Sequence, residues 1–248
     1  MGSSDDHLQA SLTSLAERIS AAAARTGRRA DAITLVAVSK TFAADAVQAL
    51  ARLGQRHFGE SYVQEAVAKV DAVRAAAPEL RLVWHFIGPI QSNKTRPIAA
   101  RFDWVQSVDR LKIAQRLAEQ RPGDLPPLNV LLQVNISGET SKGGVAPADL
   151  PALARAVAAL PRLRLRGLMA IPEPEDDPAR QRAPLLAMKR LFDAQRAAAF
   201  ADWDTLSMGM SSDLEAAIDC GATMVRVGTA LFGARALRGD SADSGEPQ

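Results

Sequence analysis

The chain has 248 residues, 47% of them hydrophobic and 23% charged, which fits one globular domain of barrel size better than two small domains. Its 30 Lys and Arg against 28 Asp and Glu leave a net charge of +2, so no strong field attracts polyanions and nucleic acid is not an expected partner. The single cysteine, Cys220, excludes an intrachain disulfide and a thiolate metal cluster and indicates a reducing compartment, for which we expect the cytoplasm. The N-terminus lacks a signal-peptide pattern and no apolar run reaches spanning length, so we expect neither secretion nor a membrane span.

The first segment is predicted to be an amphipathic helix, because apolar residues recur in it at helical spacing. We expect residues 1–32 to hold this helix and to pack on the domain of residues 33–237. Residues 238–248 contain no large apolar residue and are expected to be a disordered tail. The apolar stripe consists of Leu8, Leu12, Leu15 and Ile19.

Eight short apolar runs follow, and they lack strict alternation, as is typical of parallel strands buried on both faces. Stretches rich in Ala, Leu and Arg separate them. This alternation of strand and helix predicts an α/β fold, a single (β/α)8 TIM barrel with an extra N-terminal helix; a doubly wound open sheet is the competing fold. The runs are 33–38, 57–60, 82–87, 104–108, 130–136, 165–171, 206–210 and 224–232, and the clearest helical stretches are 43–53, 110–119, 148–160 and 182–200.

Two local signals refine this pattern. Ser212-Asp-Leu-Glu215 reads as a capping box and Gly221 as a C-terminal cap, which predicts a helix over 213–220. The segment 172–178 combines three prolines with acidic residues that repel one another, so we expect a long mobile loop there.

In a (β/α)8 barrel the functional side chains come from the carboxyl ends of the strands. The first predicted strand is wholly apolar and ends at Ser39 and Lys40. Partial burial there disfavours the ammonium form of the lysine, which lowers its pKa toward that of a nucleophilic amine able to form a Schiff base. The alternative is a Lys40 that reaches solvent or pairs with Glu60.

The last two predicted strands end in small and hydroxyl residues, in segments 207–211 and 226–230. Beside a helix N-terminus with free N–H donors, such residues form the usual phosphate site of a barrel. Alternatively, Gly209 and Gly228 only permit tight turns from strand to helix. The pairing of the two segments favours phosphate binding.

Arg226 lies two residues before Gly228, so by strand alternation both point to the same face, toward the barrel mouth. A guanidinium would then face the candidate site. The alternative is an ion pair with an acidic residue near the predicted helix, either Asp213, Glu215 or Asp219.

Other motifs predict no chemistry. Segment 138–143 lacks the order of residues in a nucleotide-binding loop. The histidines His7, His57 and His85 lack the spacing of a helical metal pair, so we expect no metal site, and His85 is alternatively a buried core residue. Cys220, at a helix C-terminus, is expected to pack rather than react.

Short motifs spread from about Ile33 to Arg235 carry a family resemblance. They read Ala37-Val-Ser-Lys-Thr41, Phe58-Gly-Glu60, Tyr62-Val-Gln-Glu65, Trp84-His-Phe-Ile-Gly-Pro89, Gln91-Ser-Asn-Lys94, Gly167-Leu-Met-Ala-Ile-Pro172, Leu206-Ser-Met-Gly-Met-Ser-Ser-Asp213 and Val225-Arg-Val-Gly-Thr229. Together they resemble the YggS/PROSC family of pyridoxal phosphate homeostasis proteins.

The resemblance implies a barrel similar to the N-terminal domain of alanine racemase, with pyridoxal 5′-phosphate held as a Schiff base on Lys40. It also implies that Arg226 is the partner of the pyridine nitrogen. The family usually has Asn where this chain has Ser61, so we expect that contact to be lost or mediated by water. The residues expected around the cofactor are Lys40, Ser61, His85, Ser207, Ser211, Arg226, Gly228 and Thr229.

An arginine beside the pyridine nitrogen does not give up its proton, so the nitrogen stays unprotonated and the cofactor is a weak electron sink. We also expect no second domain after Arg235 to supply an acid or base on the opposite ring face. The resemblance therefore implies a monomer without established turnover that binds and buffers pyridoxal phosphate and delivers it to enzymes that require it.

Two enzymatic alternatives remain open. A pyridoxal phosphate dependent racemase or decarboxylase would use His85 or Tyr62 as its acid or base. A barrel lyase that forms a Schiff base with a sugar phosphate also needs a lysine and a phosphate site.

Overall fold

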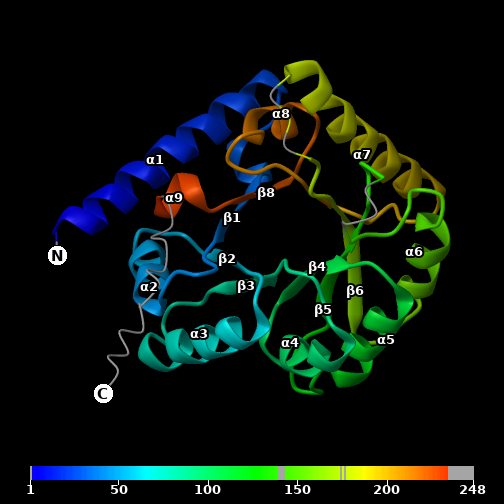
Figure 1. The fold of residues 1–248 in the computed structure, drawn as a ribbon, viewed down its shortest axis with the longest axis horizontal. Coiled ribbons are helices and arrows are strands. Elements are labelled where there is room, and N and C mark those ends of the chain that lie inside the picture. The colour runs from blue at the N-terminus through cyan, green and yellow to red at the C-terminus, as the bar shows by residue number, and fades with distance from the viewer. Residues whose placement is uncertain (1, 139–142, 174, 176, 234–248) are drawn as a thin grey trace, which may run out of the picture.

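Eight parallel strands close into a barrel in chain order, and β8 completes the ring by pairing with β1 (Figure 1). This computed structural model describes residues 2–138, 143–173, 175 and 177–233. The closed ring confirms the TIM barrel and excludes the open sheet. The strands are β1 (Thr34–Val38), β2 (His57–Glu60), β3 (Val83–Phe86), β4 (Trp104–Val108), β5 (Leu128–Gln133), β6 (Leu163–Met169), β7 (Thr205–Ser207) and β8 (Met224–Val227).

Helices cover the outside of the barrel, as right-handed crossovers between parallel strands require (Figure 1). Each of the eight predicted runs overlaps one strand of the barrel, although β5, β6 and β7 begin one or two residues before the predicted runs. The helices are α1 (Gly2–Arg25), α2 (Ala44–Arg52), α3 (Val63–Ala76), α4 (Thr95–Arg101), α5 (Leu111–Gln120), α6 (Leu150–Ala158), α7 (Pro178–Ala198), α8 (Leu214–Asp219) and α9 (Thr229–Phe232), with 3-10 turns η1 (Ala30–Ala32) and η2 (Ser92–Lys94).

The N-terminal helix α1 lies across α8 and α9, over the outside of the last barrel units (Figure 1). Its predicted stripe faces the barrel, since Leu8, Leu15 and Ile19 are buried and Leu12 packs partly buried against the core. Each fully buried leucine or isoleucine stabilises the docked helix by roughly 1.5–3 kcal/mol. The expected tail, residues 238–248, lies outside the described residues.

The core has two layers. Side chains between the strands and the helices form the larger cluster, and a smaller one fills the barrel interior. On β1, Val36 belongs to the interior cluster, whereas its neighbours Leu35 and Ala37 pack with the outer one, as strand alternation requires. Trp104 and Met224 join Val36 in the interior.

Three differences between the predicted elements and the structure have a local cause in a side chain or a turn. The run 224–232 is not one strand: β8 ends at Val227, Gly228 turns the chain, and the rest is α9. The capping box does not form, because α8 begins at Leu214 and the Asp213 carboxylate accepts from the Met210 N–H at 2.6 Å. Helix α7 begins at Pro178, where Asp177 caps it by accepting from two backbone N–H groups.

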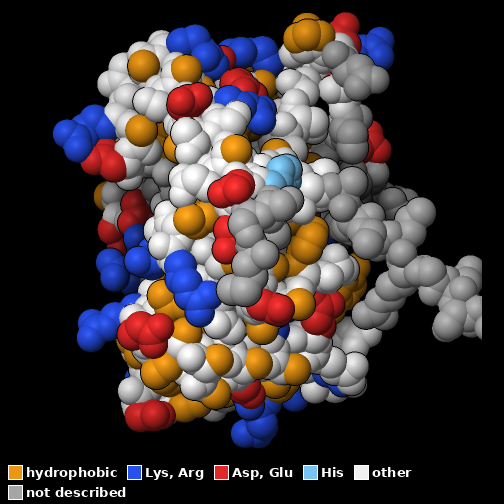
Figure 2. Space-filling model, turned by 90° about the vertical axis from the view of Figure 1, so that its left-hand side faces the viewer, with side chains coloured by type: hydrophobic (Ala, Val, Ile, Leu, Met, Phe, Trp, Pro, Cys, Tyr) orange, Lys and Arg blue, Asp and Glu red, His pale blue; other side chains and the backbone are white. Residues whose placement is uncertain are grey.

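The surface agrees with the low net charge. Figure 2 shows basic and acidic side chains interspersed on one face, without a patch of a single sign on its described part. Among the described residues, no helix has the length and apolarity to cross a membrane. Within the same part of the chain, no group of three or more His, Cys, Asp or Glu side chains could hold a metal ion.

Candidate functional site

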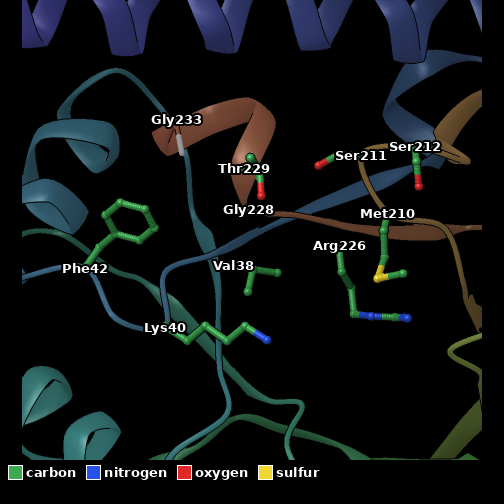
Figure 3. Close-up of a pocket in the computed structure, with 10 residues that line it drawn as sticks. All are labelled: Val38, Lys40, Phe42, Met210, Ser211, Ser212, Arg226, Gly228, Thr229 and Gly233. Atoms are coloured by element: carbon green, nitrogen blue, oxygen red, sulfur yellow. The ribbon is translucent and has the colours of Figure 1, made fainter. Parts of the chain in front are cut away.

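A cavity of about 240 Å3 lies at the carboxyl ends of β1, β7 and β8. Figure 3 shows Lys40 reaching into it from one side, Arg226 across from it, and Ser211 and Thr229 at another wall. None of the lining residues carries a carboxylate, whereas two of them are cationic. The lining consists of Val38, Lys40, Phe42, Met210, Ser211, Ser212, Arg226, Gly228, Thr229 and Gly233.

Lys40 occupies the turn that follows β1 and is half-buried. The next residue, Thr41, has φ +72°, a left-handed conformation that is uncommon for a residue other than glycine. The Phe42 N–H donates to the Ser39 carbonyl at 3.0 Å and closes the turn. The buried strand and this tight turn together place the lysine at the mouth of the barrel, as predicted.

Arg226 is a buried cation on β8, with 4% of its surface exposed. Its Nη1 donates to Ser207 Oγ at 2.6 Å and its Nη2 to the Ala170 carbonyl at 2.8 Å. Burial lowers the pKa of Arg226 to about 10, while the more distant charge of Asp213 opposes that shift. The guanidinium therefore stays charged at neutral pH.

The acidic residues offered as alternative partners of Arg226 have other bonds. Glu215 pairs with Arg18 at 2.7 Å, Asp219 pairs with Arg25 at 3.1 Å, and Asp213 holds the turn before α8. The structure thus favours the interpretation in which the guanidinium faces the cavity.

The hydroxyl-rich wall of the cavity comes from the turns after β7 and β8. Ser211 and Thr229 line it together with the backbone at Gly228. Arg18 of α1 donates to the Ser211 carbonyl at 3.3 Å and makes two further hydrogen bonds to the Glu215 carboxylate. The N-terminal helix thereby fixes the turn that carries Ser211. Because α8 and α9 are short, the individual N–H and O–H donors, rather than a helix dipole, supply the polarity here.

A chain of hydrogen bonds runs from Arg226 through the barrel interior. Ser207 Oγ accepts from Arg226 and donates to Gln106 Oε1 at 2.7 Å. The Gln106 amide nitrogen then faces His85 Nδ1 at 2.9 Å, and His85 Nε2 faces His57 Nδ1 at 2.9 Å. Since the amide nitrogen donates, His85 carries its proton on Nε2 and donates it to His57, and both rings are neutral. Desolvation holds the pKa of His85 well below its ordinary value and also lowers that of His57.

The apoprotein is therefore expected to lose stability as the pH falls below about 6.5. Both imidazoles have a lowered pKa in the folded state, so below 6.5 the unfolded chain binds protons that the folded chain does not. The free energy of unfolding should fall by up to about 1.4 kcal/mol per pH unit for each histidine. Urea unfolding at pH 7.5, 6.5 and 5.5 measures this slope.

The variant His85→Gln should reduce that slope, because a glutamine can accept from Gln106 and donate to His57 without titrating. The exposed His7 lies outside this chain of hydrogen bonds, and His7→Gln is the matched control. A wild-type slope equal to that of His85→Gln would contradict the prediction.

The structure does not bring all the predicted site residues together. It places Lys40, Ser211, Arg226, Gly228 and Thr229 around the cavity. Ser207 lies beneath Arg226 and is fully buried.

The two remaining residues lie elsewhere. His85 is fully buried, stacked on Trp104, and does not line the cavity. Ser61 lines a neighbouring hollow with Tyr62, and its backbone is so close to Gly88 that a Cβ there would lie 2.1 Å from the Ser61 carbonyl oxygen. This close contact with Gly88 fixes the loop after β2, and Ser61 lies outside the Lys40 cavity.

Sequence reasoning missed several residues of the site. Met210, Ser212 and Phe42 line the cavity. Gln106 is a polar residue inside the fully buried strand β4, and this is the sequence signal that points to it. The Ala170 carbonyl had no sequence signal, because any residue supplies a backbone acceptor.

Comparisons with known proteins agree with this architecture. The family model for the alanine racemase N-terminal domain matches residues 10–236. The chain is 60% identical to the pyridoxal phosphate homeostasis protein of Pseudomonas aeruginosa over 90% of this chain and 94% of that protein. It is 55% identical to the protein of the same name from Escherichia coli, over 90% of this chain and 95% of that one.

A solved structure extends the likeness to three dimensions. PipY of Synechococcus elongatus, determined with pyridoxal phosphate bound, is 37% identical and superimposes with a TM-score of 0.74 over 88% of this chain and 99% of that chain. Identity at this level over almost the full length of the relatives confirms the resemblance that the motifs indicated. The chain belongs to the family of pyridoxal phosphate homeostasis proteins, whose fold is that of the alanine racemase N-terminal domain.

Proposed function

We propose that this protein binds pyridoxal 5′-phosphate in the cavity of Lys40 and Arg226, and buffers and delivers it without catalysing a reaction of its own. The observation that carries the proposal is the convergence of a lysine, a buried arginine and two hydroxyl groups on one cavity, with no carboxylate among its described lining residues. That donor set suits a dianionic phosphate, an aromatic nitrogen and an aldehyde at once. The names of the relatives and the ligand of PipY support the same assignment.

Each part of the cofactor has a matching group in the cavity. Ser211, Thr229 and the backbone at Gly228 would hold the phosphate, and Arg226 would donate to the ring nitrogen. When bound, pyridoxal phosphate supplies an aldehyde to which the Lys40 amine can bond covalently as a Schiff base. Ser207 would act through Arg226, and His85 only through the hydrogen-bond chain.

The same residues argue against turnover. Arg226 keeps its proton at neutral pH, so it does not protonate the ring nitrogen and the ring withdraws electrons only weakly. His85 is neutral and buried, and Tyr62, 54% exposed, lines a different hollow. Neither candidate for the acid or base of a racemase or decarboxylase lines the cavity. A sugar phosphate contains no aromatic nitrogen, so a lyase that acts on one does not require an arginine in this position.

The setting of the function is also part of the proposal. We infer a monomer in the cytoplasm, because the lone cysteine indicates a reducing compartment and charges of both signs are interspersed on the face in Figure 2. Enzymes that lack their pyridoxal phosphate are the proposed transient recipients. Residues 33–237 would form the binding domain, with residues 1–32 packed on it.

The test is covalent labelling of the lysine. Purified protein mixed with pyridoxal phosphate should develop a visible absorbance band, and borohydride reduction followed by peptide mapping should find the label on Lys40. Lys40→Ala should abolish both the band and that label, because no other lysine of the described residues lines the cavity. The exposed Lys112→Ala is the matched control and should behave as the wild type. Label scattered over surface lysines would overturn the proposal.

A further inference from the structure

A buried network of charged side chains lies below the Lys40 turn. The Lys69 ammonium, on α3, lies 2.7 Å from Glu60 Oε1 at the end of β2 and 2.9 Å from Glu65 Oε1 on its own helix. The side chains of Lys69 and Glu60 are 4% and 0% exposed, and that of Glu65 is 31% exposed. None of these three residues has a role in the proposed function.

The network bonds to both residues that flank Lys40. Lys69 Nζ donates to the Ser39 carbonyl at 2.7 Å, and Ser39 Oγ donates to Glu60 Oε1 at 2.6 Å. On the other side, the Thr41 N–H donates to Glu65 Oε1 at 2.6 Å. The peptide units before and after Lys40 are therefore both anchored to the same cluster of buried charges.

This arrangement is a poor way to gain stability alone. Burying an ion pair is often no better for stability than packing apolar side chains of similar volume. One oxygen of the pair, Glu60 Oε2, is buried without a hydrogen-bond partner, which adds a cost. Thr41 is held at φ +72°, where a non-glycine residue is strained. The contacts that offset these costs converge on one turn, and that turn presents Lys40.

We propose that Lys69, Glu60 and Glu65 are positioning residues that hold the Lys40 amine in the geometry in which it attacks the cofactor aldehyde. The inference rests on the proposed function. In that step the neutral amine adds to the aldehyde carbon, the C=N bond forms, and the carbonyl oxygen leaves as water. A small misplacement of an attacking group slows such a step far more than it weakens binding of the rest of the ligand.

The test separates attack by Lys40 from binding at the rest of the cavity. Pyridoxine 5′-phosphate carries an alcohol in place of the aldehyde, so it reports on the phosphate and ring contacts alone. Lys69→Met should slow borohydride-trapped labelling of Lys40 by pyridoxal phosphate at least about tenfold. Its affinity for pyridoxine 5′-phosphate should stay within about twofold of the wild type, because Arg226, Ser211 and Thr229 lie outside the network.

The controls keep the outcome interpretable. Lys112→Met, on the exposed face of α5, removes a lysine without touching the turn and should label at the wild-type rate. If Lys69→Met does not fold, Glu65→Ala removes the acceptor of the Thr41 N–H and one carboxylate partner of Lys69, leaves the Lys69–Glu60 pair in place, and should slow labelling in the same way.

Equal labelling rates for the wild type and a folded variant would overturn the inference and leave the proposed function intact. An equal loss of labelling and of pyridoxine 5′-phosphate affinity would also overturn it, since the network would then support the whole cavity. A wild type that does not label at Lys40 would remove the proposed function and this inference with it.

Discussion

Replacing Arg226 with methionine is expected to lower the affinity for pyridoxal phosphate about 10- to 100-fold and to leave the apoprotein as stable as the wild type or more stable. The loss of affinity follows from removing a charged donor that would meet the ring nitrogen, a hydrogen bond worth about 1.5–3 kcal/mol. The effects on affinity and on stability have opposite signs, because burying this cation costs stability in the apoprotein and provides a donor for the bound ligand.

The stability argument comes from the lowered pKa of the guanidinium. Burial lowers the pKa of Arg226 to about 10, which means that it disfavours the charged form in the folded state. That penalty is present in full at neutral pH and is relieved only as the pH rises above about 10. Methionine removes the penalty and leaves Ser207 bonded to Gln106, and a single backbone acceptor, the Ala170 carbonyl, loses its donor.

Arg121 offers the matched control. It is also a buried arginine, but it donates to the backbone carbonyls of Ala99, Phe102 and Pro126, away from the cavity. Arg121→Met should lower the free energy of unfolding by about 2 kcal/mol or more and leave the ligand affinity unchanged. Urea unfolding of the apoprotein and titration with pyridoxal phosphate measure both quantities. Equal destabilisation by Arg226→Met and Arg121→Met would contradict the argument.

The barrel can be predicted from the sequence, because the periodicity of apolar residues is a local property. Runs such as 33–38 and 104–108 lack alternation, which is typical of strands covered on both faces, and helical stretches separate the runs. Since a parallel barrel turns all its strand ends to one side, Lys40, Arg226 and Thr229 could be predicted to meet without any distance information. The structure places these three around one cavity.

The errors arose where a tertiary contact decides between two local preferences. Ser212 and Glu215 have the spacing of a capping box, but Glu215 is taken by Arg18, 197 residues away in the chain. His85 follows a strand pattern that fits either the cavity or the core. Its neighbours Gln106 and Trp104 on β4 make it a core residue.

The network of Lys69, Glu60 and Glu65 cannot be predicted from the sequence, because it also depends on tertiary contacts. Glu60 and Lys69 are nine residues apart on different elements, and no sequence rule pairs a strand end with the middle of the following helix. Their bond to the Lys40 turn depends on how α3 docks against the barrel. Only a three-dimensional structure contains that information.

Gly167→Ala is expected to destabilise the protein by about 4 kcal/mol or more, or to prevent its folding. Gly167 lies on β6 with φ +145°, and a Cβ added there would lie 2.0 Å from the Thr205 carbonyl oxygen of β7 and 2.9 Å from the ring of Phe192. Gly167 and Thr205 face one another in the register of these two strands. A backbone oxygen in a barrel has little room to yield, so β6 and β7 must separate.

The consequence reaches the ligand site, because β6 and β7 lead to both acceptors of Arg226. The Ala170 carbonyl follows β6, Ser207 ends β7, and the Ala170 N–H donates to the Ser207 carbonyl at 3.1 Å. Separation of the strands should therefore disperse the anchors of the guanidinium. Thermal unfolding with and without pyridoxal phosphate measures this, and any Gly167→Ala protein that folds should gain little protection from the ligand.

Gly123→Ala is the matched control for the Gly167 prediction. Gly123 is exposed in a turn, its φ is not positive, and no atom lies within 4 Å of an added Cβ. This variant should stay within about 0.5 kcal/mol of the wild type and keep full protection by the ligand. A Gly167→Ala protein with the stability of Gly123→Ala would mean that β6 and β7 can separate without loss. Their spacing would then not fix the place of Arg226, and the arginine would owe its position to Gln106 and Ser207 alone.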